Sequence, residues 1–230
     1  MNHSRIGAGR AIASVVVLIA GGMLLSGKLP STAAQAPAQG RGPAAAPAAP
    51  AGPVTLEVAP GTRASYRVTE QFVGINFPSD ASGSTEAVTG SLRIAPDGSI
   101  DSAQSKLMID LRTLKSDQDN RDNFLRTRTL ETEKFPMVEF VPRRIQGLPS
   151  PFPANGQAGF QLIGDMTVRG VKAEVTWNGV ATFSAQQVAG RATTTFDFAK
   201  FGLTKPAIGR LMSVEDKILL ELEFRMKRTG

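Results

Sequence analysis

The sequence predicts an all-β domain of about eight antiparallel strands with one short helix, preceded by an export signal and a disordered linker. Three observations lead to this fold class. Residues 54–230 alternate between apolar and polar side chains, turn-forming clusters separate the alternating runs, and residues 1–53 contain no acidic residue. The strand number and length favour either a β-sandwich or a closed up-and-down barrel, and alternation alone does not choose between them.

The N-terminal segment, residues 1–36, has the order of a secretory signal. Arg5 and Arg10 precede an apolar run from Ala11 to Leu25, and small residues follow, with Ala34-Gln-Ala36 as a cleavage pattern. The run has 15 residues, which is short for a membrane span of about 20 residues. We therefore expect a cleaved signal, with an uncleaved membrane anchor as the alternative. Both place the domain in an exported compartment, most simply a bacterial periplasm.

Residues 37–53 form the predicted linker before the domain, which we place at 54–230. From Pro30 to Pro53, 19 of 24 residues are Ala, Pro or Gly. Such a stretch cannot bury a hydrophobic core and is typical of a disordered, partly extended spacer.

The clearest strand lies at the C-terminus. In residues 217–227, apolar side chains from Ile218 to Met226 alternate with Lys, Glu and Arg, and Leu219 is the exception. A period of two with charges opposite apolar residues predicts a half-buried strand. The same alternation predicts further strands at 107–111, 160–168, 173–181 and 192–198, and others near 64–73, 86–95 and 137–145. Turns are expected at Pro96-Asp-Gly98, at Arg169-Gly170 and over 147–156.

One segment, residues 117–126, breaks the alternation and is predicted to be a short helix across one mouth of the β structure. Ser116 is the expected N-cap, and the acidic residues that follow it complement the helix dipole. Phe124 and Leu125 are its expected buried contacts. The same acidic residues resemble a calcium loop only superficially, because Arg121, Asp122 and Arg128 occupy positions that need other ligands or Gly.

Composition excludes several classes of function. The chain has no Cys, so it has no disulfide, thiolate metal site or Cys nucleophile, and its one His is His3, within the predicted signal. Ser-His-Asp triads and His-based metal sites are therefore not expected in the mature domain. Four of the 26 basic residues lie in 1–53, which leaves 22 bases against 20 acids in 54–230. This near balance disfavours nucleic-acid binding.

The apolar strand faces either fill a solid core or leave room for an elongated ligand, and periodicity alone does not separate these outcomes. A ligand would contact the inward side chains of the predicted strands. These candidate wall residues are Phe72, Leu107, Ile109, Phe140, Phe160, Leu162, Trp177, Phe196, Phe198, Leu220, Leu222 and Phe224.

Several segments resemble the YceI-like family in order and spacing over essentially all of residues 64–228. One departure is that Tyr66-Arg-Val68 is followed by Thr69-Glu-Gln-Phe72, without the Asp-x-x-His-Ser element that many members carry, so the chain is similar to a divergent branch. The segments that carry the resemblance are Asp110-Leu-Arg-Thr-Leu-Lys-Ser-Asp-Gln-Asp-Asn-Arg-Asp-Asn-Phe-Leu125, Glu133-Lys-Phe-Pro-Met-Val-Glu-Phe140, Gly164-Asp-Met-Thr-Val-Arg-Gly-Val171, Phe198-Ala-Lys-Phe-Gly-Leu203 and Val214-Glu-Asp-Lys-Ile-Leu-Leu-Glu-Leu222.

The resemblance implies a lipocalin-like antiparallel barrel that acts as a non-enzymatic periplasmic carrier of a polyisoprenoid or isoprenoid-quinone type of amphiphile. It needs no metal or cofactor, and an inner-membrane partner is a further expectation. Candidate contacts with an anionic head group are Arg112, Lys115, Arg121 and Arg126, for which surface ion pairs are the simpler role. The alternatives are a structural or protein-interaction module with a solid core, and a lipid-modifying enzyme that relies on carboxylates.

Overall fold

The computed structural model describes residues 52–74, 76–206 and 211–229. The predicted signal, 1–36, and most of the predicted linker, 37–53, lie outside the described residues. The strands are β1 (Val54–Val58), β2 (Arg63–Phe72), β3 (Ser79–Thr85), β4 (Val88–Ile94), β5 (Lys106–Asp110), β6 (Lys115–Ser116), β7 (Met137–Gln146), β8 (Gly156–Val168), β9 (Val171–Phe183), β10 (Gln187–Phe196), β11 (Leu211–Val214) and β12 (Ile218–Thr229). The helices are the α-helix α1 (Asp119–Phe124), the π-helical η3 (Leu125–Thr129) and three 3₁₀ turns, η1 (Ser102–Gln104), η2 (Leu111–Thr113) and η4 (Phe198–Phe201).

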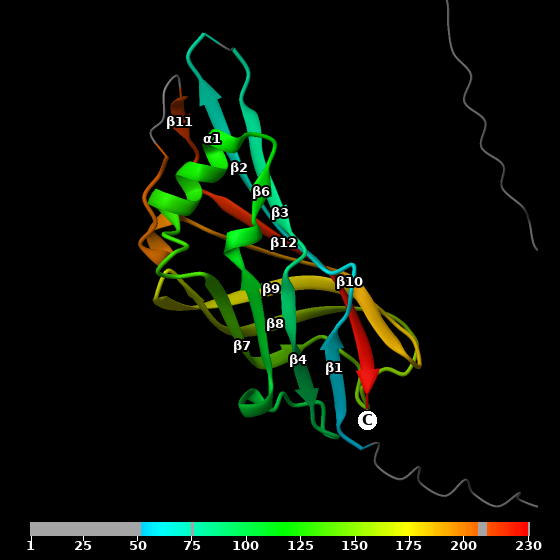
Figure 1. Ribbon diagram of the computed structural model, residues 1–230. Helices are drawn as coiled ribbons and strands as arrows, with labels where there is room; N and C mark the ends of the chain where they lie inside the picture. The colour runs from blue at the N-terminus through cyan, green and yellow to red at the C-terminus, as the bar shows by residue number, and fades with distance from the viewer. Residues whose placement is uncertain (1–51, 75, 207–210, 230) are drawn as a thin grey trace, which may run out of the picture. The chain divides into compact units, whose positions relative to one another are not determined.

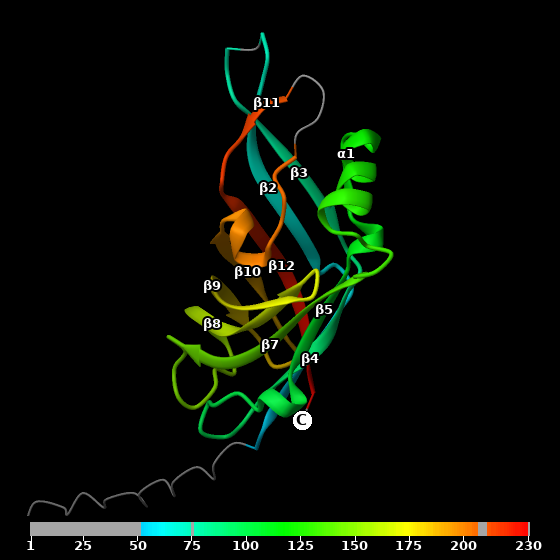
Figure 2. The ribbon, with the colours of Figure 1, turned by 90° about the vertical axis from the view of Figure 1, so that its left-hand side faces the viewer.

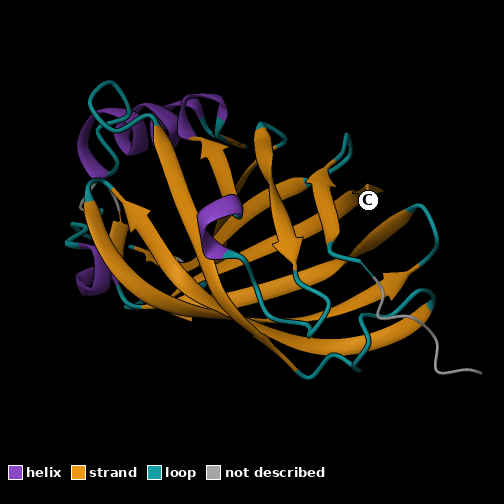
Figure 3. Cartoon of the chain, turned by 90° about the horizontal axis from the view of Figure 1, so that it is seen from below, coloured by secondary structure: helices purple, strands orange, loops and turns teal. Residues whose placement is uncertain are grey.

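Eight strands close into an antiparallel barrel, which confirms the barrel over the sandwich (Figures 1 and 3). The hydrogen-bonded order in the described chain is β1-β4-β5-β7-β8-β9-β10-β12, and β12 returns to β1. Thr55 pairs with Thr229 and Val58 with Met226, which closes the ring. A closed ring leaves no unpaired strand edge at this end of the domain.

The other end of the domain is a flared sheet. The first half of β12 pairs with β2 instead of β1, so that Leu222 lies opposite Ala64. The sheet then continues from β2 to β3 and from β3 to the two-residue strand β6, and β11 also pairs with β2. Along the chain, three runs of strand are each broken into one strand of the ring and one strand of the flared sheet. These runs are β1 with β2, β3 with β4, and β5 with β6. Helix α1 lies beside the flared sheet (Figure 2).

The longest hairpin joins β8 to β9 with thirteen residues in each strand. Its turn is Arg169-Gly170, as predicted, and both residues have positive φ angles, of 49° and 77°. Two successive positive φ values give a type I′ turn, whose twist matches that of the flanking strands. The strand predicted over 192–198 ends earlier than expected: β10 ends at Phe196, and Phe198 belongs to η4. Asp197 caps η4 by accepting a hydrogen bond from Lys200 N at 2.8 Å.

Strand β3 was not predicted from the sequence, because no strand was expected between those near 64–73 and 86–95. In the structure Asp80 lies on β3, where it accepts hydrogen bonds from Thr69 Oγ1 at 3.1 Å and Arg67 Nη1 at 3.5 Å. Glu86 pairs with Arg63 at 2.9 Å. The strand alternates small residues, so its inward side has little hydrophobic signal in the sequence. Both carboxylates are surface ion-pair partners.

The short helix is present, but it begins later than predicted and Ser116 is not its N-cap. Gln118 holds the N-cap position and makes no side-chain capping bond. Ser116 Oγ donates instead to the buried Asp122 Oδ1 at 2.7 Å, and Ser116 N donates to the same atom at 2.9 Å. Asp122 therefore ties α1 to β6. None of the described helices reaches the length and hydrophobicity of a membrane-spanning helix.

Candidate ligand-binding cavities

The described part of the domain contains two adjoining cavities. The first, here the barrel cavity, has a volume of about 80 Å³ and is lined by all eight strands of the ring together with Leu148 and Phe152. Apart from Thr62, its described lining consists of aliphatic and aromatic side chains and Met. The second, here the helix cavity, has a volume of about 240 Å³ and lies between the flared sheet, α1, η3 and η4.

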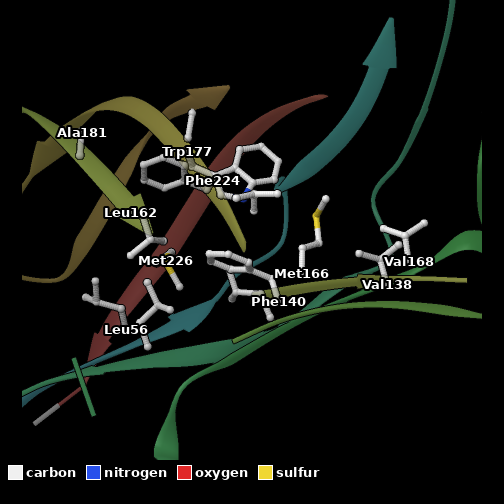
Figure 4. Packing of buried hydrophobic residues seen from close by; sticks show 14 of the residues in the cluster. Leu56, Val138, Phe140, Leu162, Met166, Val168, Trp177, Ala181, Phe224 and Met226 are labelled. Carbon is white, nitrogen blue, oxygen red and sulfur yellow. The ribbon is translucent and has the colours of Figure 1, made fainter. Parts of the chain in front are cut away.

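Four side chains line both cavities and form the waist between them: Ile109, Val138, Met166 and Trp177. Trp177 makes an edge-to-face contact with Phe140, with ring centroids 6.4 Å apart. Figure 4 shows Phe140, Trp177 and Phe224 directed into the barrel, with Met166 on the side of Val138 and Val168. The waist is therefore made of apolar groups, and Met166 has the flexible side chain among them.

Two glycines let aromatic rings lie against the barrel wall. A Cβ atom on Gly179 would be 2.6 Å from the Phe160 ring, and one on Gly190 would be 2.9 Å from the Phe224 ring. The rings of Phe160 and Phe224 also meet edge to face, with centroids 6.0 Å apart. Because glycine has no side chain, each ring lies over the backbone of the next strand instead of extending further across the interior.

The helix cavity has polar as well as apolar lining residues, and four of them, here called the polar patch, are Tyr66, Glu70, Arg121 and Thr129. Arg121 Nη2 donates to Glu70 Oε1 at 2.8 Å, and the two side chains are only 13% and 10% exposed. Arg121 also pairs with the exposed Asp117. The pKa of Arg121 is raised, because burial, which lowers it, is outweighed by the hydrogen bond with Asp117 and the charge of Glu70. The guanidinium charge is therefore already balanced by two carboxylates.

Two buried hydroxyls lack a hydrogen-bond partner among the described residues: Tyr66 Oη and Thr129 Oγ1. Both residues line the helix cavity. Burial raises the pKa of Tyr66 to about 12, against a smaller lowering by Arg121. Ser116 also lowers the pKa of Tyr66. Ser116 Oγ, however, donates to Asp122 at 2.7 Å and accepts from Gln118 N at 3.2 Å and Arg121 Nη1 at 3.5 Å. Buried hydroxyls are normally hydrogen-bonded, so these two are open to a polar group in the cavity.

The predicted wall residues divide between the two cavities. Phe72, Phe196, Phe198 and Leu220 line the helix cavity, and Ile109 and Trp177 line both. The other six line the barrel cavity: Leu107, Phe140, Phe160, Leu162, Leu222 and Phe224. The structure thus brings all twelve to the interior, and their contact with a ligand stays a prediction.

The four predicted head-group residues are not brought together. Arg121 lines the helix cavity. Arg112 is exposed and forms a two-point ion pair with Asp110, with Nη2–Oδ2 at 2.7 Å and Nε–Oδ1 at 2.9 Å. Lys115 is exposed on β6, and Arg126 is half-buried in η3; neither is among the lining residues of the described cavities.

Four further lining residues were not predicted from the sequence: Glu70, Tyr66, Thr129 and Met166. Glu70 and Thr129 are polar residues that are buried beside a cavity lined by β2, α1 and η3, and no local pattern in the sequence reveals that arrangement. Tyr66 and Met166 carried a signal, because both occupy positions within alternating runs.

A family model described as "YceI-like domain" matches residues 59–226 of this chain. The comparison with curated proteins finds no match. Among solved structures, the chain is similar to a polyisoprenoid binding domain from Saccharophagus degradans, implicated in plant cell wall breakdown. The TM-score is 0.59 at 11% sequence identity, covering 76% of this chain and 98% of that one.

Two further solved structures share the fold. Burkholderia cenocepacia BcnA matches with a TM-score of 0.51 and 14% identity over 73% of this chain and 96% of that one. The Campylobacter jejuni YCEI protein matches with a TM-score of 0.51 and 13% identity over 70% and 94%. At these identities the likeness establishes the shared barrel.

Proposed function

Because the chain belongs to the YceI-like domain family, we propose that it is a non-enzymatic carrier that holds a long-chain amphiphile, of polyisoprenoid or isoprenoid-quinone type, inside the barrel. The observation that carries this proposal is the pair of adjoining apolar cavities with a polar patch in the outer one. The similarity to a polyisoprenoid binding domain supports the class of ligand. The alternative, an interaction module with a solid core, predicts neither cavity.

The cavities suit a hydrocarbon chain because apolar contacts do not demand one chain conformation. Each CH₂ group removed from water stabilises the complex by about 0.8 kcal/mol. A chain of tens of carbons therefore has a negligible concentration in water, and its movement between membranes needs a closed apolar container. Trp177 and Met166 would contact the chain where it passes the waist.

The polar patch favours an uncharged head group over a phosphate. Arg121 is paired with Glu70 and Asp117, so a phosphate would find no free positive charge in the patch. The hydroxyls of Tyr66 and Thr129 can each donate to an oxygen of an alcohol or a quinone carbonyl. We therefore propose a neutral head group that accepts hydrogen bonds, and the anionic head group stays the alternative that the lipid analysis tests.

The carrier would work in an exported compartment, as the N-terminal sequence predicts, and would exchange its cargo with a membrane or an inner-membrane partner. No catalytic role is proposed for the carboxylates. Asp80, Glu86 and Glu70, for example, are all engaged with arginines.

The test is gentle purification of the exported protein, solvent extraction and mass spectrometry of the co-purified lipid. We expect a stoichiometric, uncharged prenyl lipid. The double variant Phe196→Ala with Leu222→Ala removes side chains from the cavity walls. It should retain less lipid, while its far-ultraviolet circular dichroism spectrum, and so its secondary structure, should stay unchanged. An empty wild-type protein that also ignores added prenyl alcohol in detergent would overturn the proposal, and turnover of an added lipid would favour the enzyme alternative.

A further inference from the structure

The turn between β2 and β3 has an unusual surface. Among the described residues, four large apolar side chains are exposed, and two of them, Val73 and Phe77, lie in this turn. Phe77 is 79% exposed and Val73 is 52% exposed. Single exposed apolar residues are ordinary, but two in one turn leave an apolar tip in contact with water.

The tip also lacks charge. Residues 71–79 contain no Asp, Glu, Lys or Arg. Gly74, Asn76 and Pro78 are ordinary turn-forming residues, so the exposed Val73 and Phe77 are what sets this turn apart. Charged residues begin directly below it, with Glu70, which pairs with Arg121 at 2.8 Å, and Asp80, which pairs with Arg67 at 3.5 Å. An uncharged apolar tip above charged residues has the polarity profile of the boundary between a membrane and water.

The tip continues the wall of the helix cavity. Val68 and Phe72 on β2 and Ala81 on β3 line that cavity, and Val73 follows Phe72 directly. In two perpendicular views the turn lies at the opposite end of the domain from the C-terminus and the closed ring (Figures 1 and 2). An apolar surface that touched the tip would therefore lie next to the larger cavity.

We propose that the β2–β3 turn inserts Phe77 and Val73 into the surface of a lipid bilayer and so places the helix cavity at the membrane that supplies or receives the cargo. This proposal rests on the proposed carrier function for its purpose, but not for its geometry. Two side chains cannot bury the roughly 1,200 Å² that a stable protein interface needs. A lipid surface needs no such complementary area, and the absence of charge predicts binding to neutral lipid that salt does not weaken.

The chain has no Cys, so a single introduced thiol can report on the tip alone. The experiment uses the full chain carrying Phe77→Cys, labelled with an environment-sensitive fluorophore and mixed with phosphatidylcholine vesicles. The matched control is Val180→Cys, at an exposed position of β9. Each label reports only its own surroundings. Binding of a vesicle through the apolar residues of 1–36 would therefore not change the fluorescence of the label at position 77.

We expect the emission at position 77 to rise several-fold and shift to the blue with vesicles, at low and at high salt, while the label at 180 stays unchanged. No change at 77, or equal changes at both positions, would overturn the proposal. A change at 77 that follows protein concentration without vesicles would also overturn it, in favour of a second copy as the partner.

A second measurement separates docking from cargo binding. Phe77→Ser should slow transfer of a fluorescent prenyl alcohol between vesicles about tenfold, the effect of losing one buried aromatic side chain, and Val180→Ser should not. Binding of the prenyl alcohol in detergent should be equal in both variants. If the wild-type protein binds no prenyl alcohol in detergent but the label at 77 still enters vesicles, the carrier function fails and the docking stands. If transfer is equally fast in both variants, the docking proposal fails and the carrier function stands.

Discussion

Replacing Tyr66 with Phe should stabilise the empty protein and weaken the binding of a head group that accepts a hydrogen bond. The Tyr66 hydroxyl is buried without a partner among the described residues. Burying an unpaired hydroxyl costs about 1–3 kcal/mol, whereas the phenyl ring keeps its packing. Tyr66→Phe should therefore raise the free energy of unfolding of the empty protein by about 1 kcal/mol or more.

The same substitution should lower affinity only for ligands with an oxygen at the head. One hydrogen bond contributes about 0.5–1.5 kcal/mol, which corresponds to roughly 2- to 12-fold in Kd. A prenyl alcohol should bind more weakly by this factor, and a prenyl hydrocarbon of equal length should bind as it does to the wild type. Trp177, the only tryptophan, lines both cavities and can report both urea unfolding and ligand titration.

The reasoning would be refuted if Tyr66→Phe destabilised the empty protein, because the hydroxyl would then already be satisfied, by water or by Ser116. Equal loss of affinity for the alcohol and the hydrocarbon would likewise show that the ring packing, and not the hydroxyl, had changed. Thr129→Val removes the second unpaired hydroxyl without changing the shape of the side chain, and it should act in the same direction.

Three further predictions concern the waist, the ion pair and alkaline pH. Met166→Ala should lower the free energy of unfolding in urea by about 2–5 kcal/mol. By opening the waist it should also shift the co-purified lipids towards bulkier chains. Unchanged stability together with an unchanged lipid profile would contradict the assignment of Met166 to the waist. Glu70→Ala should lower the free energy of unfolding by about 3 kcal/mol, because it leaves the mostly buried Arg121 with one partner. Asp117→Ala, at the exposed partner, should lower it by less than about 1 kcal/mol. Equal losses of stability in chemical denaturation would count against the buried pair. Burial holds the folded-state pKa of Tyr66 at about 12, above its ordinary value of 10.0. The free energy of unfolding should therefore be unaffected by ionisation of this phenol below pH 10 and should fall as pH rises towards 12, because the unfolded chain ionises first. Unfolding and the phenolate absorbance of this single tyrosine, measured across that range, should show the fall, and Tyr66→Phe should abolish it.

The strands with large inward side chains were predictable from the sequence because alternation records which side is buried. This is why β7, β8, β9 and β12 were located closely, and why the turn at Arg169-Gly170 was correct. Strand β3 was not predictable in this way, since Ala81, Gly83 and Thr85 on its inner side have the composition of a loop. Ring closure was equally invisible, because the contact of β1 with β12 joins residues at the two ends of the domain.

The apolar wall of the site followed from the same alternation, but its polar patch did not. Counting basic residues near the helix gave four head-group candidates, and only the fold shows that Arg121 turns inward and meets Glu70. The two hydroxyls without partners depend on what surrounds them in three dimensions. Burial and hydrogen bonding across distant segments are properties of the tertiary structure, so a single sequence does not contain them in readable form.

Three runs of strand are broken between the ring and the flared sheet. The domain therefore has two regions whose sequences can be changed separately. The hydrogen bonds that close the ring involve β1 and β12, whereas Tyr66, Thr129 and Arg121 lie on β2, η3 and α1. Substitutions in the flared region can therefore alter which head group is accepted without moving the register of the closed ring. For protein engineering, this means that a barrel of fixed chain capacity could be given new head-group preferences by exchanging only residues 63–85 and 115–130.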